Sequence, residues 1–162
     1  MSTPVVRVEL KRANAVDVLS TDAELKQQPL VRELLALPGK LDGAVFRRFA
    51  VGGVVWQQGD EGDALLLVVG GAARLFARRD KDNAELGLAQ KGEVLGERAA
   101  LTGERKRAYS AVAHAQLDVL EVPRALLLVN GSLPPGLSKL LQLVQTQRAA
   151  ALDELSDFLN RW

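Results

Sequence analysis

The chain has 162 residues, with 21 Lys plus Arg against 20 Asp plus Glu, one His and no Cys. Without cysteine, thiol catalysis, Fe–S clusters and Cys-based zinc sites are excluded, and a single histidine argues against multi-histidine metal sites and most acid–base dyads. We therefore expect no catalytic residues. The formal net charge of +1 lacks the basic excess of a protein that neutralises nucleic-acid phosphates, so we also expect no nucleic-acid partner.

Hydropathy predicts no membrane partner. No apolar run approaches the roughly 18 residues of a membrane span, and the first residues have no charged segment leading into an apolar one. We therefore expect a cytoplasmic protein. One domain without disulfide or metal is the default, because a chain of this length buries about 70% of the surface that it exposes when unfolded.

The first 42 residues carry helix signals. Thr21 and Glu24 have the spacing of a capping box, which predicts a short helix beginning directly after Thr21. Pro29 can occupy a first helical position, and Pro38 with the glycine after it stops the segment. Residues 1–42 are therefore predicted to form an N-terminal helical lead.

Residues 43–122 have the pattern of a turn-rich β segment. Eleven of the fourteen glycines lie between Gly43 and Gly103, a window without proline. Gly70-Gly71 predicts a two-residue hairpin, and the polar residues 81–83 predict a second turn. Short strands with such turns indicate a closed or double-sheet β architecture. The predicted strands are residues 45–49, 54–57, 64–69, 72–77, 84–89, 108–114 and 117–122.

Residues 123–162 return to a helical pattern. Pro123 and Gly131 bracket a short helix, and from Leu137 to Trp162 apolar residues recur at i, i+3 and i+4 spacing, with Arg148 within the same stripe. This predicts a long amphipathic C-terminal helix. The expected fold class is mainly β with flanking α: a double-stranded β-helix, or jelly-roll-like barrel, with N-terminal helices and a long C-terminal helix.

The most informative motif is Gly96-Glu97, followed ten positions after the glutamate by Arg107-Ala108. This spacing resembles the phosphate-binding cassette of cyclic-nucleotide-binding domains, of the catabolite-activator and cAMP-dependent-kinase regulatory-subunit type. Glycine-containing strand-turn patterns upstream are also similar to that family. The resemblance covers roughly residues 45–130, and it implies a β-roll that binds a cyclic nucleotide.

The resemblance also implies a role for each cassette residue. Arg107 would engage the cyclic phosphate, since a guanidinium offers a planar fork of N–H donors to two exocyclic oxygens. Backbone N–H groups at the start of the cassette helix would add donors, and the small Ala99 would let the anion approach. Glu97 would accept a hydrogen bond from the ribose 2′-OH and so select ribose over deoxyribose. The implied ligand-binding residues are Gly96, Glu97, Arg98, Ala99, Arg107, Ala108 and Tyr109, with no metal ligand and no cofactor apart from cAMP or cGMP as the ligand.

Tyr109 departs from the family pattern. Nucleotide-binding members usually have a small residue at this second position after the arginine, and strand alternation sends Tyr109 to the same face as Arg107. The tyrosine would either occlude the phosphate subsite or hydrogen-bond the ligand. Ala108 replaces the hydroxyl residue that the family associates with cGMP preference, which favours cAMP.

Simpler readings of the same residues stay open. A glutamate that opens a helix commonly compensates the helix dipole, and an arginine after two other cations is commonly part of a solvated turn. Arg105 and Lys106 lie close enough to shift the register of the phosphate-binding residue. Arg107 is preferred because Ala108 and a later alanine fit only in that register.

The C-terminal helix has two predicted uses. It packs on the barrel alone, or it pairs with a second copy to form a homodimer, as in catabolite-activator-type dimers. The resemblance makes Gln142, Gln145 and Arg148 candidates for contact with the base. Because the sequence ends at Trp162, we expect no helix-turn-helix DNA-binding domain after it.

These features predict a cyclic-nucleotide sensing and regulatory module, for cAMP more than cGMP, that relays occupancy to an unidentified protein partner through its C-terminal helices. The alternative is a degenerate domain that acts as a ligand-independent interaction or dimerisation scaffold, which Tyr109 and the charged Arg105-Lys106 favour. A cupin-like metal enzyme would need clustered His and carboxylate ligands, and one histidine cannot supply them. By domain region, the prediction is a helical lead over 1–42, a β-roll core over 43–122 and C-terminal helices over 123–162.

Overall fold

The computed structural model describes residues 7–9, 14–79 and 82–160, and within them nine strands form two antiparallel sheets. The strands are β1 (Arg7–Glu9), β2 (Val45–Phe49), β3 (Val54–Trp56), β4 (Leu65–Gly70), β5 (Ala72–Arg79), β6 (Asp82–Gln90), β7 (Val94–Leu95), β8 (Ser110–Ala113) and β9 (Leu117–Val122). The helices are α1 (Ala15–Thr21), the 3₁₀ helix η1 (Leu25–Gln27), α2 (Pro29–Leu35), α3 (Glu97–Thr102), α4 (Arg124–Leu127) and α5 (Pro135–Asn160). One sheet has the order β1-β2-β9-β4-β7 and the other β3-β8-β5-β6, which confirms the mainly β, jelly-roll-like class with flanking helices.

Strand β4 shows how the two sides of the first sheet are filled. Its central residues are a continuous apolar run, as is typical of a strand that is buried on both faces. Leu65 and Leu67 face the core under the helices, whereas Leu66 and Val68 face the core between the sheets. Because alternate residues face opposite sides, β4 contributes to both cores of the domain. Burying each leucine stabilises the fold by about 1.5–3 kcal/mol.

The predicted hairpin at Gly70-Gly71 is wrong. Strand β4 pairs with β7 and β9, whereas β5 pairs with β6 and β8, so the two glycines carry the chain from one sheet to the other. Gly71 has a φ of +77°, and a Cβ there would lie 1.9 Å from the carbonyl oxygen of Gln116. A glycine is therefore needed for close approach of two backbones rather than for a hairpin turn.

The N-terminal helices differ from the prediction in their capping. Helix α1 begins after Asn14, whose side chain accepts a hydrogen bond from the Asp17 N–H, and it ends at Thr21, where a helix was expected to begin. The Thr21 hydroxyl donates back to the carbonyl of Asp17 at 2.6 Å. Asp22, just after α1, accepts with its Oδ1 from the N–H groups of Glu24 and of Leu25, the first residue of η1, each at 3.0 Å. Helix α2 begins at Pro29, as predicted.

Strand β1 was not anticipated within the helical lead, and it pairs antiparallel with β2. Other parts of the prediction fall on residues 1–6, 10–13, 80–81 and 161–162, which lie outside the described residues. They include Trp162 and part of the turn predicted between β5 and β6. Those two strands do pair antiparallel, with Arg79 opposite Asp82.

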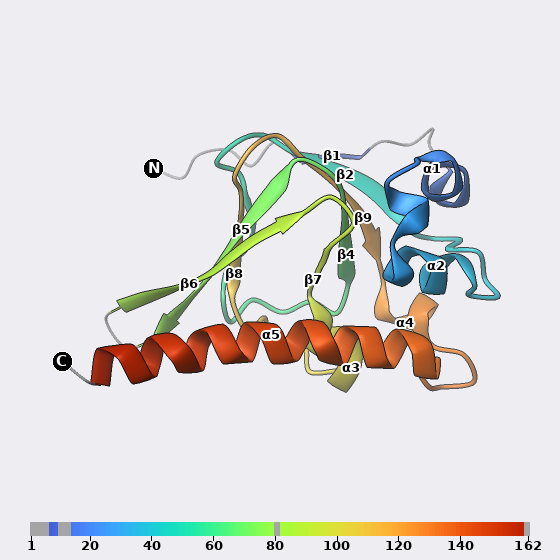
Figure 1. Cartoon of the computed structure of the whole chain (residues 1–162). Coiled ribbons are helices and arrows are strands. Elements are labelled where there is room, and N and C mark those ends of the chain that lie inside the picture. The colour runs from blue at the N-terminus through green and yellow to red at the C-terminus, as the bar shows by residue number, and fades with distance from the viewer. Residues whose placement is uncertain (1–6, 10–13, 80–81, 161–162) are drawn as a thin grey trace.

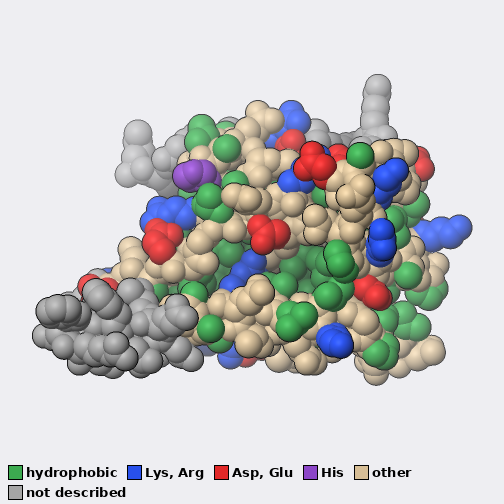
Figure 2. Space-filling view, viewed as in Figure 1, with side chains coloured by type: hydrophobic (Ala, Val, Ile, Leu, Met, Phe, Trp, Pro, Cys, Tyr) green, Lys and Arg blue, Asp and Glu red, His purple; other side chains and the backbone are tan. Residues whose placement is uncertain are grey.

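Helix α5 lies across one end of the roll. Figure 1 shows it running beneath the sheets, with α3 beside it, and extending past β6 towards the C-terminus. It packs against α2, α3 and β6. Figure 2 shows hydrophobic side chains along the seam above α5. Leu137 and Leu141 of α5 are fully buried, as the amphipathic stripe predicts. The α5 side chains beyond Ala151 lie outside the described residues.

Candidate functional site

The turn into α3 depends on a glycine. Gly96 follows β7 with a φ of +87°, a conformation that other residues rarely adopt. A Cβ at Gly96 would lie 2.7 Å from the carbonyl oxygen of Ala64 and 2.9 Å from Nη1 of Arg107. Glycine at this position therefore allows the turn into α3 and also the close approach of the Arg107 guanidinium to that turn.

Glu97, the first residue of α3, is 2% exposed and has two side-chain donors. The Tyr109 hydroxyl donates to its Oε1 at 2.7 Å, and Nη1 of Arg148 forms an ion pair with the same oxygen. A buried carboxylate without such partners would destabilise the fold by several kcal/mol. Because Arg148 belongs to α5, this acid joins the short helix to the C-terminal helix.

Tyr109 lies at the centre of this network and is 5% exposed. Its hydroxyl oxygen accepts a hydrogen bond from the Gly96 N–H at 2.8 Å and one from Nη1 of Arg148 at 3.0 Å. Burial, together with the negative charge of Glu97, raises the pKa of the Tyr109 phenol above its usual value. The phenol therefore stays protonated at neutral pH and acts as a donor to the carboxylate.

Arg148 also reaches the strand that leads into the turn. Its Nη2 donates to the carbonyl oxygen of Val94 in β7, and its guanidinium carbon lies 5.4 Å from the centre of the Tyr109 ring. One side chain of α5 thus contacts the residues before, within and after the short helix. The arrangement fixes α5 against this part of the roll.

Arg107 is 8% exposed and lies within the roll. Its guanidinium carbon is 3.8 Å from the centre of the Trp56 ring, which gives a cation–π contact. Its Nη1 is buried and has no hydrogen-bond partner among the described residues. Burial lowers the pKa of the Arg107 guanidinium, and nearby acidic groups partly offset this lowering. A buried cation with an unsatisfied donor is suited to an anion.

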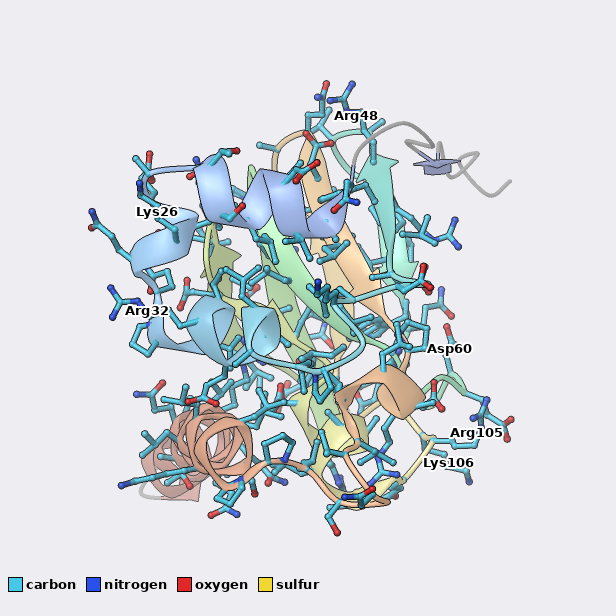
Figure 3. The ribbon with its side chains drawn as sticks, turned by 90° about the vertical axis from the view of Figure 1, so that its right-hand side faces the viewer. Lys26, Arg32, Arg48, Asp60, Arg105 and Lys106 are labelled. Atoms are coloured by element: carbon cyan, nitrogen blue, oxygen red, sulfur yellow. The ribbon has the colours of Figure 1, made fainter. Side chains whose placement is uncertain are left out.

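The backbone around Arg107 is held by the loop between β3 and β4. The Arg107 N–H donates to the carbonyl of Asp60, and the Gly59 N–H donates to the carbonyl of Arg107, both at 2.8 Å. Figure 3 shows Arg105 and Lys106 pointing outward from the roll, and both are exposed. Of the three consecutive cations, only Arg107 is therefore turned into the roll, in the register that the spacing favours.

Two cavities are bordered by residues of this region. One, of about 290 Å³, is bordered within the roll by Arg107, Trp56 and acidic groups that include Asp63. The other, of about 310 Å³, lies between β6 and α5 and is bordered by Leu86 and Arg148. Small-molecule sites usually have volumes of about 300–1,000 Å³, so each cavity is near the lower limit.

The structure brings most of the predicted site residues together. Glu97 and Tyr109 are hydrogen-bonded, the Gly96 N–H donates to the Tyr109 hydroxyl, and a Cβ at Gly96 would lie 2.9 Å from Nη1 of Arg107. Arg98 is the exception among the side chains, because it is exposed and forms an ion pair with Glu104 at 2.8 Å. Ala99 is buried and Ala108 is half-buried in the same region. Their contact with a ligand stays a prediction.

The role of Arg148 was not recognised from the sequence, where it was a candidate for contact with a base. Instead it binds Glu97, 51 positions away. A signal was available, because a charged residue within an apolar helix stripe requires a buried partner. Gln142 is exposed, and its amide donates to the Ser138 hydroxyl at 3.1 Å.

Two other kinds of site are absent from the part of the chain that the structure describes. Among these residues, no three or more His, Asp or Glu side chains form a group that could hold a metal ion. Within the same part of the chain, no helix has the length and hydropathy of a membrane span.

Comparison with known proteins identifies the family. Residues 46–128, more than half of the chain, match the profile of the cyclic nucleotide-binding domain family. No curated protein matches the sequence.

Solved structures support the same fold. A cyclic nucleotide-binding domain from Methylobacillus flagellatus has a TM-score of 0.66 and 20% identity, over 96% of this chain and 89% of that one. The PKAR CBD2 domain bound to Sp-2Cl-cAMPS has a TM-score of 0.62 and 21% identity, over 86% and 88%. The c-di-GMP-responsive global regulator CLP of Xanthomonas campestris has a TM-score of 0.59 and 23% identity, over 82% of this chain but 62% of the regulator. The chain thus spans less than two thirds of that regulator. The profile match, on a β-roll that places the predicted cassette beside α5, shows that the chain belongs to the cyclic nucleotide-binding domain family, whose domains are regulatory rather than catalytic.

Proposed function

We propose that this chain is a cytoplasmic, non-catalytic module that responds to a cyclic nucleotide, cAMP in preference to cGMP, and relays occupancy to a protein partner through α5. The observation that carries the proposal is the ion pair between Glu97 of the cassette and Arg148 of α5. A ligand hydroxyl that binds Glu97 competes with Arg148 for the same carboxylate. Binding would therefore change how α5 is attached, which is the differential contact that a relay requires.

The environment of Arg107 supports an anionic ligand. The guanidinium is buried, its Nη1 has no hydrogen-bond partner among the described residues, and it lies against the turn at Gly96. A cyclic phosphate carries one negative charge and would supply the missing acceptors. The preference for cAMP comes from Ala108, which offers no hydroxyl beside Arg107. It agrees with the cAMP analogue in the similar PKAR CBD2 structure.

Thermal unfolding and calorimetry test the proposal. A ligand at 100 times its dissociation constant should stabilise the protein by about 2.7 kcal/mol, so the melting temperature should rise with millimolar cAMP and less with cGMP. Cyclic di-GMP belongs in the same screen, because the similar Xanthomonas regulator responds to it. If cyclic di-GMP alone raises the melting temperature, the assignment of a cyclic mononucleotide is wrong.

A matched pair of variants tests the phosphate residue. Arg107→Ala should weaken cAMP binding by about 2–5 kcal/mol, as is usual when one partner of a buried charged pair is lost. Arg105→Ala is the control, because Arg105 is exposed and lies in the same segment. An unchanged dissociation constant for Arg107→Ala would remove Arg107 from the site. Equal losses in both variants would indicate only a general effect of positive charge.

The second candidate is a ligand-independent scaffold, and Tyr109 is the observation that favours it. The Tyr109 hydroxyl already donates to Glu97 and accepts from the Gly96 N–H. A domain closed in this way could hold α5 in one position for a protein partner or for a second copy of the chain. No change in melting temperature with any of the three nucleotides would favour this function.

A further inference from the structure

We propose that the phenol of Tyr109 is a built-in occupant of the ribose subsite, which a cyclic nucleotide must displace. The inference rests on the proposed function and adds a residue that sets affinity and ribose selectivity. Tyr109 would thus determine how much ligand the domain requires before it responds.

The first argument is the hydrogen-bonding pattern of the hydroxyl. The Tyr109 O–H donates to Glu97 at 2.7 Å and accepts from the Gly96 N–H at 2.8 Å. A sugar hydroxyl has the same capacity, with one donor and two acceptor lone pairs on an oxygen bound to carbon. The chain therefore already supplies the hydrogen bonds that a ribose 2′-OH would make with this acid, and the two hydroxyls exclude each other.

The second argument is the position of the ring. The Tyr109 ring centre lies 6.1 Å from that of Trp56, which borders the cavity within the roll. On the other side, the Arg148 guanidinium lies over the Tyr109 ring and borders the groove beside α5. The ring thus lies between Trp56 and Arg148, which border spaces of about 290 and 310 Å³ that are each near the lower limit for a small-molecule site. Removing the ring should therefore open additional volume between Trp56 and Arg148.

The two arguments predict different effects for two substitutions. Tyr109→Ala removes both the hydroxyl and the ring, so it should leave Arg148 as the side-chain partner of Glu97 among the described residues and open volume beside this acid. Tyr109→Phe removes the hydroxyl alone and keeps the contact with Trp56. The phenylalanine variant should therefore gain ribose selectivity without gaining the added volume.

Calorimetric titration of the whole chain with cAMP and with 2′-deoxy-cAMP separates these effects. Tyr109→Ala should bind cAMP at least about tenfold more tightly than the wild type, a difference of about 1.4 kcal/mol. Its preference for cAMP over 2′-deoxy-cAMP should also rise by at least about tenfold, because the ribose hydroxyl gains Glu97 as a partner. Tyr109→Phe should show the increase in selectivity with a smaller gain in affinity. Lys106→Ala, exposed in the same segment, is the control and should match the wild type.

The outcomes distinguish this inference from the proposed function. If the wild type binds no nucleotide and Tyr109→Ala binds cAMP, the inference stands and the native chain is not a sensor. If the wild type binds cAMP and both variants bind equally or more weakly, the sensor stands and the inference is overturned. Absence of binding in all variants overturns both. Circular dichroism establishes that each variant is folded, and if Tyr109→Ala is unfolded, the selectivity of Tyr109→Phe decides.

Discussion

Arg148→Met would detach α5 from the cassette while keeping most of the apolar length of the side chain. The substitution removes the ion pair with Glu97 and the hydrogen bonds to Tyr109 and Val94. It leaves the carboxylate of Glu97, which is 2% exposed, with the Tyr109 hydroxyl as its remaining side-chain donor among the described residues. We expect the folded protein to be destabilised.

The burial of the pair sets the magnitude. The side chains of Arg148 and Glu97 are 14% and 2% exposed, and breaking such a pair by removing one partner usually costs about 3–5 kcal/mol. The surviving bond from Tyr109 places Arg148→Met near the lower value, about 3 kcal/mol. In a domain of this size that corresponds to a fall of about 6–12 °C in melting temperature.

A double-mutant cycle with Glu97→Gln, followed by urea unfolding, isolates the pair. We expect a coupling energy of about 2 kcal/mol between the two substitutions. The control cycle uses Arg98→Met and Glu104→Gln, a pair at the same helix whose side chains are 46% and 45% exposed. An exposed pair should couple by less than about 1 kcal/mol. If the Arg148 and Glu97 substitutions were additive, or coupled no more than the control pair, the reasoning that α5 is tied to the cassette here would be refuted.

Two further predictions concern the stability of the fold outside the site. Gly71→Ala should destabilise the protein by several kcal/mol, because a Cβ there would lie 1.9 Å from the carbonyl oxygen of Gln116. The control is Gly59→Ala, at a φ of +90° with no atom near its Cβ, which should destabilise the protein by only about 1–3 kcal/mol. Equal midpoints of urea unfolding for the two variants would contradict the clash at Gly71. Asp22→Ala should cost about 1 kcal/mol at pH 7, since the Asp22 side chain accepts from the N–H groups of Glu24 and Leu25 at the start of η1. Hydrogen bonds from the Leu25 N–H and from Lys91 hold the Asp22 pKa below its usual value, so this stabilisation is present above about pH 4 and is lost as the pH falls through the lower, folded-state pKa. Urea unfolding at pH 7 and pH 3 should therefore show the gap between wild type and Asp22→Ala narrowing at pH 3, and a gap that widens would contradict the assignment.

Local patterns predicted the strands better than their pairing. Residues 45–49 and 117–122 were predicted with the bounds of β2 and β9, because apolar residues and flanking turn residues mark both ends. The turn at Gly70-Gly71 was misassigned, since the choice of sheet for β5 depends on long-range pairing with β8. The close approach of Gly71 to Gln116 likewise cannot be predicted from residues that are neighbours in the sequence.

The site residues also fall into those that local spacing predicted and those that depend on long-range contacts. Glu97, Arg107 and Tyr109 were found by their spacing within one short stretch. Arg107 and Tyr109 both contact Trp56, but they precede β8, which begins at Ser110 rather than at Ala108, so the alternation of a strand does not explain their shared side. The bond between Glu97 and Arg148 could not be read from spacing, because it depends on how α5 crosses the end of the roll. Only the presence of an arginine in an apolar stripe indicated that Arg148 had a buried partner.

The link between nucleotide occupancy and α5 can be measured directly by the distance between two spin labels. The chain has no cysteine, so Val51→Cys on the roll and Ala149→Cys on α5, both exposed, would carry the labels alone. Pulsed electron spin resonance with saturating cAMP should give a changed or broadened distance distribution, and a Val51–Glu61 pair on the roll should not change. An α5 distance that stays the same while calorimetry shows the site to be filled would contradict the relay.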